Sequence, residues 1–159
     1  MVEFLRRRLV DPILALLRQG LAPRELALCL ALGTGIGLFP VLGVSTPLLA
    51  VIALLWRLNL AAIQLVNYLI YPLQLLLIIP FVRLGETMTG AAPQPLTITA
   101  GLDLMSQGVW HAVVTLWDAI VHATLGWVLL GPAGIYVLYR LLEPVLRRAA
   151  QRLTSGDAP

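Results

Sequence analysis

Long stretches without a charged residue constrain this chain more than any other feature. Leu26 to Trp56 is uncharged over 31 positions, Leu58 to Val82 over 25, and Ala119 to Tyr139 over 21. A helix needs about 20 apolar residues to cross the roughly 30 Å hydrocarbon core of a bilayer. The second and third stretches have that length, which predicts an all-α, polytopic helical membrane protein.

The composition excludes other classes of protein. Hydrophobic residues make up 59% of the 159 positions and charged residues 12%, whereas soluble domains have roughly 45–50% and about 25%. Too few polar side chains are present to cover a soluble fold. The basic residues lie at the ends of apolar stretches and not along one surface, so we exclude a nucleic-acid binder as well as a soluble or disordered chain.

The first uncharged stretch does not have the pattern of one helix. Glycine and proline crowd its centre, at Gly33, Gly35, Gly37, Pro40, Gly43 and Pro47. Proline lacks a backbone donor and glycine disfavours helix, so the stretch is expected to divide into arms at 26–39 and 47–56 around a break at 40–46. Neither arm can cross a bilayer, which predicts a re-entrant hairpin whose break is covered by other helices or by a partner subunit.

Arginine placement predicts the topology. The net charge is +2 over residues 1–25, −2 over 83–118 and +2 over 140–159. If the hairpin returns to its own side and each later stretch crosses once, the positive-inside rule places both termini in the cytoplasm. Six arginines are expected to contact the membrane surface: Arg6, Arg7, Arg8, Arg57, Arg147 and Arg148.

The chain is expected to consist of five segments in series. They are an amphipathic cytoplasmic segment (1–25), a Gly/Pro-rich membrane core (26–85) with the hairpin 26–56 and a kinked spanning helix 58–82, an outside loop with an interfacial helix (86–118), a last spanning helix (119–139), and a basic cytoplasmic tail (140–159). Trp110 and Trp117 in the interfacial helix are typical of the headgroup boundary.

The glycine-rich break is the first candidate site. Gly33 and Gly37 form a small-xxx-small pair that allows close helix contact. A broken helix also frees backbone groups that can meet a ligand, as in transporters. Both a packing role alone and a ligand or conduction role stay open for the candidate residues of this stretch: Gly33, Gly35, Gly37, Pro40, Gly43 and Thr46.

A polar stripe on the middle stretch is the second candidate. Its members follow at spacings of 3, 4 and 3, which places them on one helix face: Gln64, Asn67, Tyr71 and Gln74. We expect this face to meet the hairpin, where it either forms interhelical hydrogen bonds or lines a polar path. Asn59 near the start joins the path candidates, whereas Arg83 and Glu86 are expected to anchor the far end at the interface.

A third group has the residue types of a proton relay or metal site. His111, Thr115, Asp118 and His122 share a face if their segment is one continuous helix. The hydrated face of an interfacial helix is the simpler interpretation. No Walker, GxSxG, HExxH or dinucleotide motif is present in the sequence, so we expect no catalytic residue, metal or cofactor.

Several of these residues together form a recognisable pattern. It comprises Pro23-Arg24-Glu25-Leu26-Ala27, the Gly33-x-Gly35-x-Gly37-x-Phe39-Pro40-x-x-Gly43 core with Thr46, Arg57-x-Asn59, Asn67, Pro72, Pro80 and Gly85, and the portion from Gly126 to Arg140. The chain thereby resembles the bacterial membrane family named domain of unknown function 2062. Many relatives place Asn where this chain has Tyr71. The resemblance implies an integral protein of the bacterial cytoplasmic membrane, and similar domains joined to glycosyltransferases imply a cell-envelope pathway.

Two principal functions remain open from the sequence, beside a third in which the chain is a membrane-embedded enzyme that uses His111, Asp118 and His122. The first is the handling or translocation of a small polar solute, an ion or a lipid headgroup along a path between the hairpin and the kinked helix. The second is a non-transporting scaffold that docks an envelope enzyme, such as a glycosyltransferase, on a basic cytoplasmic surface. The expected partners are membrane lipids, with a homo-oligomer or an envelope-biosynthesis enzyme, and no nucleic acid.

Overall fold

The computed structural model describes residues 15, 20–93, 99, 102–103 and 106–156 of the chain. Within these residues the elements are all helical: α3 (Pro23–Gly37), α4 (Ser45–Trp56), α5 (Leu60–Thr89), α7 (Val109–Thr115) and α8 (Trp117–Gly156). The prediction of an all-α protein is therefore confirmed. The predicted surface residues Arg6, Arg7 and Arg8 lie outside the described part of the chain.

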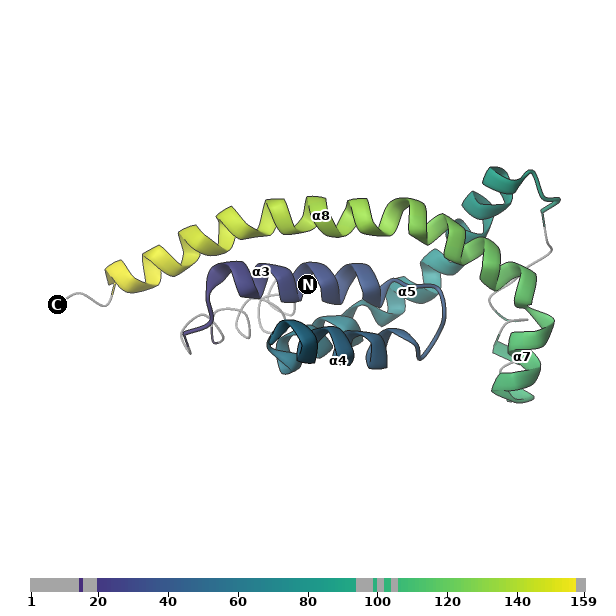
Figure 1. The fold of residues 1–159 in the computed structure, drawn as a ribbon, viewed down its shortest axis with the longest axis horizontal. Helices are drawn as coiled ribbons and strands as arrows, with labels where there is room; N and C mark the ends of the chain where they lie inside the picture. The colour runs from purple at the N-terminus through teal and green to yellow at the C-terminus, as the bar shows by residue number, and fades with distance from the viewer. Residues whose placement is uncertain (1–14, 16–19, 94–98, 100–101, 104–105, 157–159) are drawn as a thin grey trace.

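The helices form an elongated bundle around α3 (Figure 1). Helix α5 runs alongside α3 in the same direction, α8 runs back along both, and α4 folds back from the end of α3. Leu26 of α3 and Ile63 of α5 are fully buried in the core cluster that these helices share. A second cluster, nearer the α5–α8 crossing, joins Phe81 and Val82 to Ala119 and Ala123.

Local sequence explains where α3 begins and ends. Pro23 occupies the first turn, where no amide hydrogen is needed, and Glu25 places a negative charge near the positive end of the helix dipole. Helix α3 ends at Gly37, and the amides of Leu38 and Phe39 close the last turn onto the carbonyls of Thr34 and Ile36. The break expected in the first uncharged stretch is thus present, between Gly37 and Ser45.

The connection from α4 to α5 is a tight turn. Arg57 adopts a left-handed conformation with φ of 54°, and the amide of Leu58 donates to the carbonyl of Ala53 at 2.8 Å. Asn59 then caps α5, its side chain accepting a hydrogen bond from the Ala62 amide at 2.9 Å. These roles give the Arg57-x-Asn59 pattern a local structural explanation, which does not require a ligand.

Helices α5 and α8 are long and apolar enough to cross a membrane. Only 28% and 11% of their most apolar windows are buried, unlike the core helix of a soluble protein. Their large apolar side chains therefore face outward, which supports association with a membrane. Helix α5 extends beyond the predicted 58–82 segment to Thr89, and α8 joins the predicted last span and much of the tail into one helix of 40 residues.

The segment that precedes α8 differs from the expected continuous helix. Helix α7 ends at Thr115, and a turn at Leu116 separates it from α8, which begins at Trp117. His111 and His122 consequently belong to two different helices. The shared face predicted for His111, Thr115, Asp118 and His122 does not form, because that face requires an uninterrupted helical repeat.

Candidate functional site

The glycine-rich motif places α3 between two helices. A side-chain carbon added at Gly33 would lie 2.8 Å from the Ile63 carbonyl of α5, and one at Gly37 would lie 2.6 Å from Ile70 of the same helix. Gly35, on the opposite face, contacts Ile135 of α8. The Gly-x-Gly-x-Gly spacing therefore lets α5 and α8 approach α3 from two sides.

Two members of the polar stripe bind the start of α4. The Gln64 side-chain amide donates to the Thr46 carbonyl at 2.9 Å, and the Asn67 amide donates to the Thr46 hydroxyl at 3.0 Å. Asn67 also donates to the Gln64 side-chain oxygen at 3.2 Å. The predicted contact between this helix face and the hairpin is thus present at Thr46, the second residue of α4.

A third member binds the other side of the break. The Gln74 side-chain amide donates to the Phe39 carbonyl at 2.6 Å, and Gln74 is almost completely buried. Gln74 is the fifteenth residue of the 30-residue α5, so the break lies beside the middle of this helix. The three amide contacts, two at Thr46 and one at Phe39, hold the unwound segment 38–44 against α5 from both ends.

Tyr71 does not join this arrangement, although it shares the helix face. Its side chain is 45% exposed. Helix α4 begins at Ser45 and runs back alongside the first part of α5 (Figure 1). Pro40 is buried in the break, whereas Gly43 is exposed with φ of +82°, a conformation that favours glycine.

Helix α8 adds an aromatic residue that sequence reasoning did not single out. The Trp127 indole donates to the Gly35 carbonyl at 2.9 Å, and its ring meets Phe39 edge-on with centroids 5.1 Å apart. The break is therefore covered by α8 as well as by α5. Trp127 lies 92 positions from Gly35, so no local periodicity could have revealed this contact.

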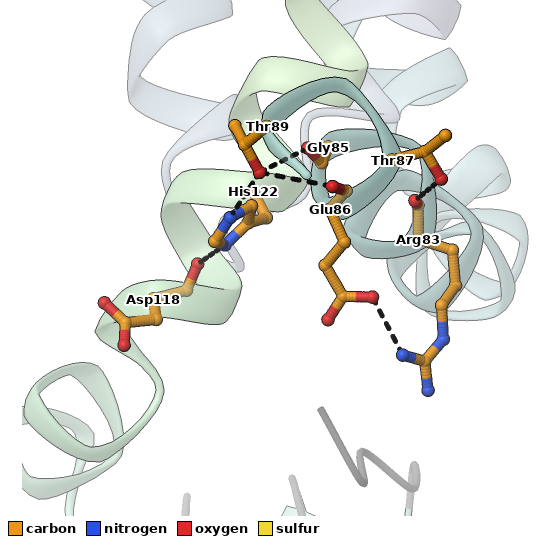
Figure 2. A network of polar contacts seen from close by, with 7 residues as sticks. All are labelled: Arg83, Gly85, Glu86, Thr87, Thr89, Asp118 and His122. Carbon is orange, nitrogen blue, oxygen red and sulfur yellow. Dashed lines mark hydrogen bonds and ion pairs between the residues drawn. The ribbon is translucent and has the colours of Figure 1, made fainter. Parts of the chain in front are cut away.

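A second polar group lies at the crossing of α5 and α8 (Figure 2). His122 donates from Nδ1 to the backbone carbonyl of Asp118 at 2.6 Å, and its Nε2 lies 3.0 Å from the Thr89 hydroxyl. Arg83 donates to the buried carboxylate of Glu86 at 2.8 Å. The crossing is close because Gly85 packs directly against the His122 backbone.

This second group lacks the geometry of a catalytic pair. The carbonyl and not the carboxylate of Asp118 binds His122, and the Glu86 carboxylate turns toward Arg83 (Figure 2). Among the described residues, no cluster of three histidine, cysteine, aspartate or glutamate side chains is arranged to hold a metal ion. The break beside α5 is therefore the stronger candidate site.

The predicted surface arginines that the structure describes are all exposed: Arg57, Arg147 and Arg148. Arg147 forms an ion pair with Glu143 at 2.8 Å, one turn earlier on α8. Leu146, between them, is buried against the core that includes α3. The end of α8 is thus amphipathic: its apolar side packs against the bundle and its basic side is exposed.

Comparisons with known proteins identify one match. A family model described as "Uncharacterized protein conserved in bacteria (DUF2062)" matches residues 6–154. No curated protein and no solved structure matches the chain.

Proposed function

The chain belongs to this bacterial family, and from that premise we propose that it handles a small polar solute, an ion or a lipid headgroup inside the cytoplasmic membrane. The site is the break between α3 and α4 where it meets Gln64, Asn67 and Gln74. The setting is a cell-envelope pathway, and both termini are cytoplasmic.

The course of the hairpin supports this location. Helix α3 begins, and α4 ends, at the end of the bundle toward which the basic part of α8 runs (Figure 1). If that end is cytoplasmic, the hairpin enters and leaves on the arginine-rich side, in agreement with the positive-inside rule. The break then lies near the bilayer midplane, which is where transporters with broken helices bind substrates and ions.

The single observation that carries the proposal is the set of amide contacts at the break. Polar side chains inside a membrane are costly and face protein or a wet cavity. Gln74 binds a backbone carbonyl of the break and Gln64 binds one in the first turn of α4, directly after it, so both hydrogen bonds would change if the break moved away from α5. A role in helix packing alone accounts for these two contacts but leaves Asn67 incompletely paired.

Reconstitution into vesicles tests the proposal. The double variant Asn67→Leu/Gln74→Leu should reduce movement of labelled phospholipids, small solutes or ions by about tenfold or more, because polar contacts of about 1–2 kcal/mol in the membrane are removed. Tyr71→Leu is the matched control, since its side chain lies on the same helix but is 45% exposed. Equal transport by wild type and the double variant, at equal amounts of folded protein, would contradict a polar path.

The basic side of α8 favours the scaffold as a second function. Arg147 and Arg148 are exposed on the part of α8 that carries the chain's basic tail. An envelope enzyme with an acidic surface, or anionic lipid, would be attracted there by about 1 kcal/mol per arginine. Arg147→Gln/Arg148→Gln should abolish co-purification of such an enzyme, whereas Arg24→Gln should not. Substitution is preferable to truncation because Leu146 belongs to the core.

The outer face of α4 suggests where a second copy or a partner would bind. Leu54, Leu55 and Trp56 are more than half exposed. Either lipid or protein can cover such a face in a bilayer. Cross-linking through a cysteine introduced at Leu55, in a Cys29→Ser background, distinguishes a homo-oligomer from a monomer surrounded by lipid.

A further inference from the structure

The hydrogen bonds at the break determine which way each amide points. A backbone carbonyl can only accept, so the group of Gln64 that meets the Thr46 carbonyl must be its nitrogen. The oxygen of Gln64 then faces Asn67, which must present its own nitrogen in return. Asn67 thereby has both amide hydrogens directed to Gln64 and Thr46, and its Oδ1 points elsewhere.

Oδ1 of Asn67 is buried without a hydrogen-bond partner in the described part of the chain. Only 3% of Asn67 is exposed, and its Oδ1 would lie 3.1 Å from a side-chain carbon placed on Gly37. The free oxygen therefore faces the last residue of α3, at the edge of the break. Leaving a buried acceptor unpaired costs about 1–3 kcal/mol, which a bound donor or cation would offset.

The groups around this oxygen favour a positive ligand over a negative one. The oxygens that accept hydrogen bonds from the side-chain amides at and beside the break are neutral: the Thr46 hydroxyl and the Gln64 side-chain oxygen for Asn67, and the Phe39 carbonyl for Gln74. The carboxyl end of α3, where Gly37 lies, carries the negative end of the helix dipole. Unwound carbonyls and half-helix carboxyl ends bind cations such as Na⁺ in broken-helix transporters, whereas an anion would be repelled by the unpaired Oδ1.

We propose that the break binds a small monovalent cation, with Asn67 Oδ1 as a ligand. This inference rests on the proposed function and names the class of ligand for the same site. The charge belongs either to a free ion such as Na⁺ or to the ammonium of an ethanolamine headgroup, because both are small and both seek neutral oxygens.

Thermal unfolding of the full-length protein in detergent tests the site without any transport assay. NaCl should raise the midpoint by about 3–5 °C for each tenfold increase above half-saturation, relative to choline chloride at equal ionic strength. In a second experiment, the unfolding midpoint in sodium-free buffer is compared between ethanolamine lipid and choline lipid. A shift with Na⁺ identifies the free ion, and a shift with ethanolamine lipid alone identifies the headgroup.

Variants of Asn67 connect the shift to this oxygen. Asn67→Leu should abolish the ligand-dependent shift, and Tyr71→Leu should leave it unchanged. Asn67→Asp keeps the size of the side chain and adds a negative charge, so it should lower the half-saturating cation concentration by about tenfold. This variant tests the site if the leucine variant does not fold. Equal midpoints in all salts and lipids, a shift that persists in Asn67→Leu, or an unaltered half-saturation in Asn67→Asp would overturn the cation site.

The two proposals fail separately. Transport that depends on Asn67 and Gln74 without any cation-dependent stabilisation removes the cation site and keeps the polar path. Cation binding without transport removes the polar path and keeps the site.

Discussion

Helix α3 and helix α4 are the two arms of one hairpin, yet α3 is enclosed by other helices while α4 exposes its outer face. Nine of the 15 residues of α3 are buried, against three of the 12 in α4. Leu54 and Leu55 of α4 are 73% and 74% exposed. Both arms are apolar, so hydrophobicity does not explain the difference.

Side-chain size explains it better. In a bilayer, lipid tails solvate leucine as well as protein does, so helices associate where small residues allow close contact. Helix α3 carries Gly33, Gly35 and Gly37, which contact α5 and α8, while the exposed side of α4 carries leucine and tryptophan. The comparison teaches that apolar character is common to both arms and that small residues select the arm that is enclosed.

The largest effect is expected at the α3–α5 contact. Gly33→Leu forces a side chain against the Ile63 backbone carbonyl and should lower the free energy of unfolding by about 3 kcal/mol. Gly134→Leu is the control, because a side chain at this α8 position meets nothing within 4 Å. Unfolding in mixed detergent micelles measures the stability of both variants. Equal stability would contradict the conclusion that small residues determine which arm is enclosed.

A medium effect is expected within α4, where one leucine is buried and its neighbours are exposed. Leu49→Ala should lower the free energy of unfolding by about 1–3 kcal/mol. The cavity left by the substitution still destabilises the fold, whereas the gain from burying leucine largely cancels in a bilayer because lipid is equally apolar. Leu55→Ala should change stability by less than about 0.5 kcal/mol. The same unfolding assay compares them, and a large loss for Leu55→Ala would show that its outer face is covered by protein.

The smallest effect is expected at the α8 side of α3. Trp127→Phe removes the hydrogen bond to the Gly35 carbonyl but keeps an aromatic ring beside Phe39. The expected loss is about 0.6 kcal/mol, the average for such bonds in membranes. Trp56→Phe, at an exposed position, should leave the free energy of unfolding unchanged. If Trp127→Phe is as stable as wild type, Trp127 covers the break by ring packing alone and its hydrogen bond does not contribute.

Parts of the site followed from local pattern and parts did not. The spacing of Gln64, Asn67 and Gln74 predicted one polar face toward the hairpin, and the structure places all three there. The same spacing included Tyr71, whose side chain is 45% exposed, unlike the buried Asn67 and Gln74. Helical periodicity gives the direction of a side chain but not how far the opposing element extends.

The helical class, the presence of two helices long enough to cross a membrane and the approximate position of the break were determined by the sequence alone. These features depend on neighbouring residues: uncharged length sets a span, and glycine with proline ends a helix. Tertiary structure decided that Gly33 meets α5 and Gly35 meets α8, that Trp127 covers the break, and that one oxygen of Asn67 has no partner among the residues that the structure describes. Those outcomes depend on contacts between residues far apart in the chain, whose geometry exists only once the helices have packed.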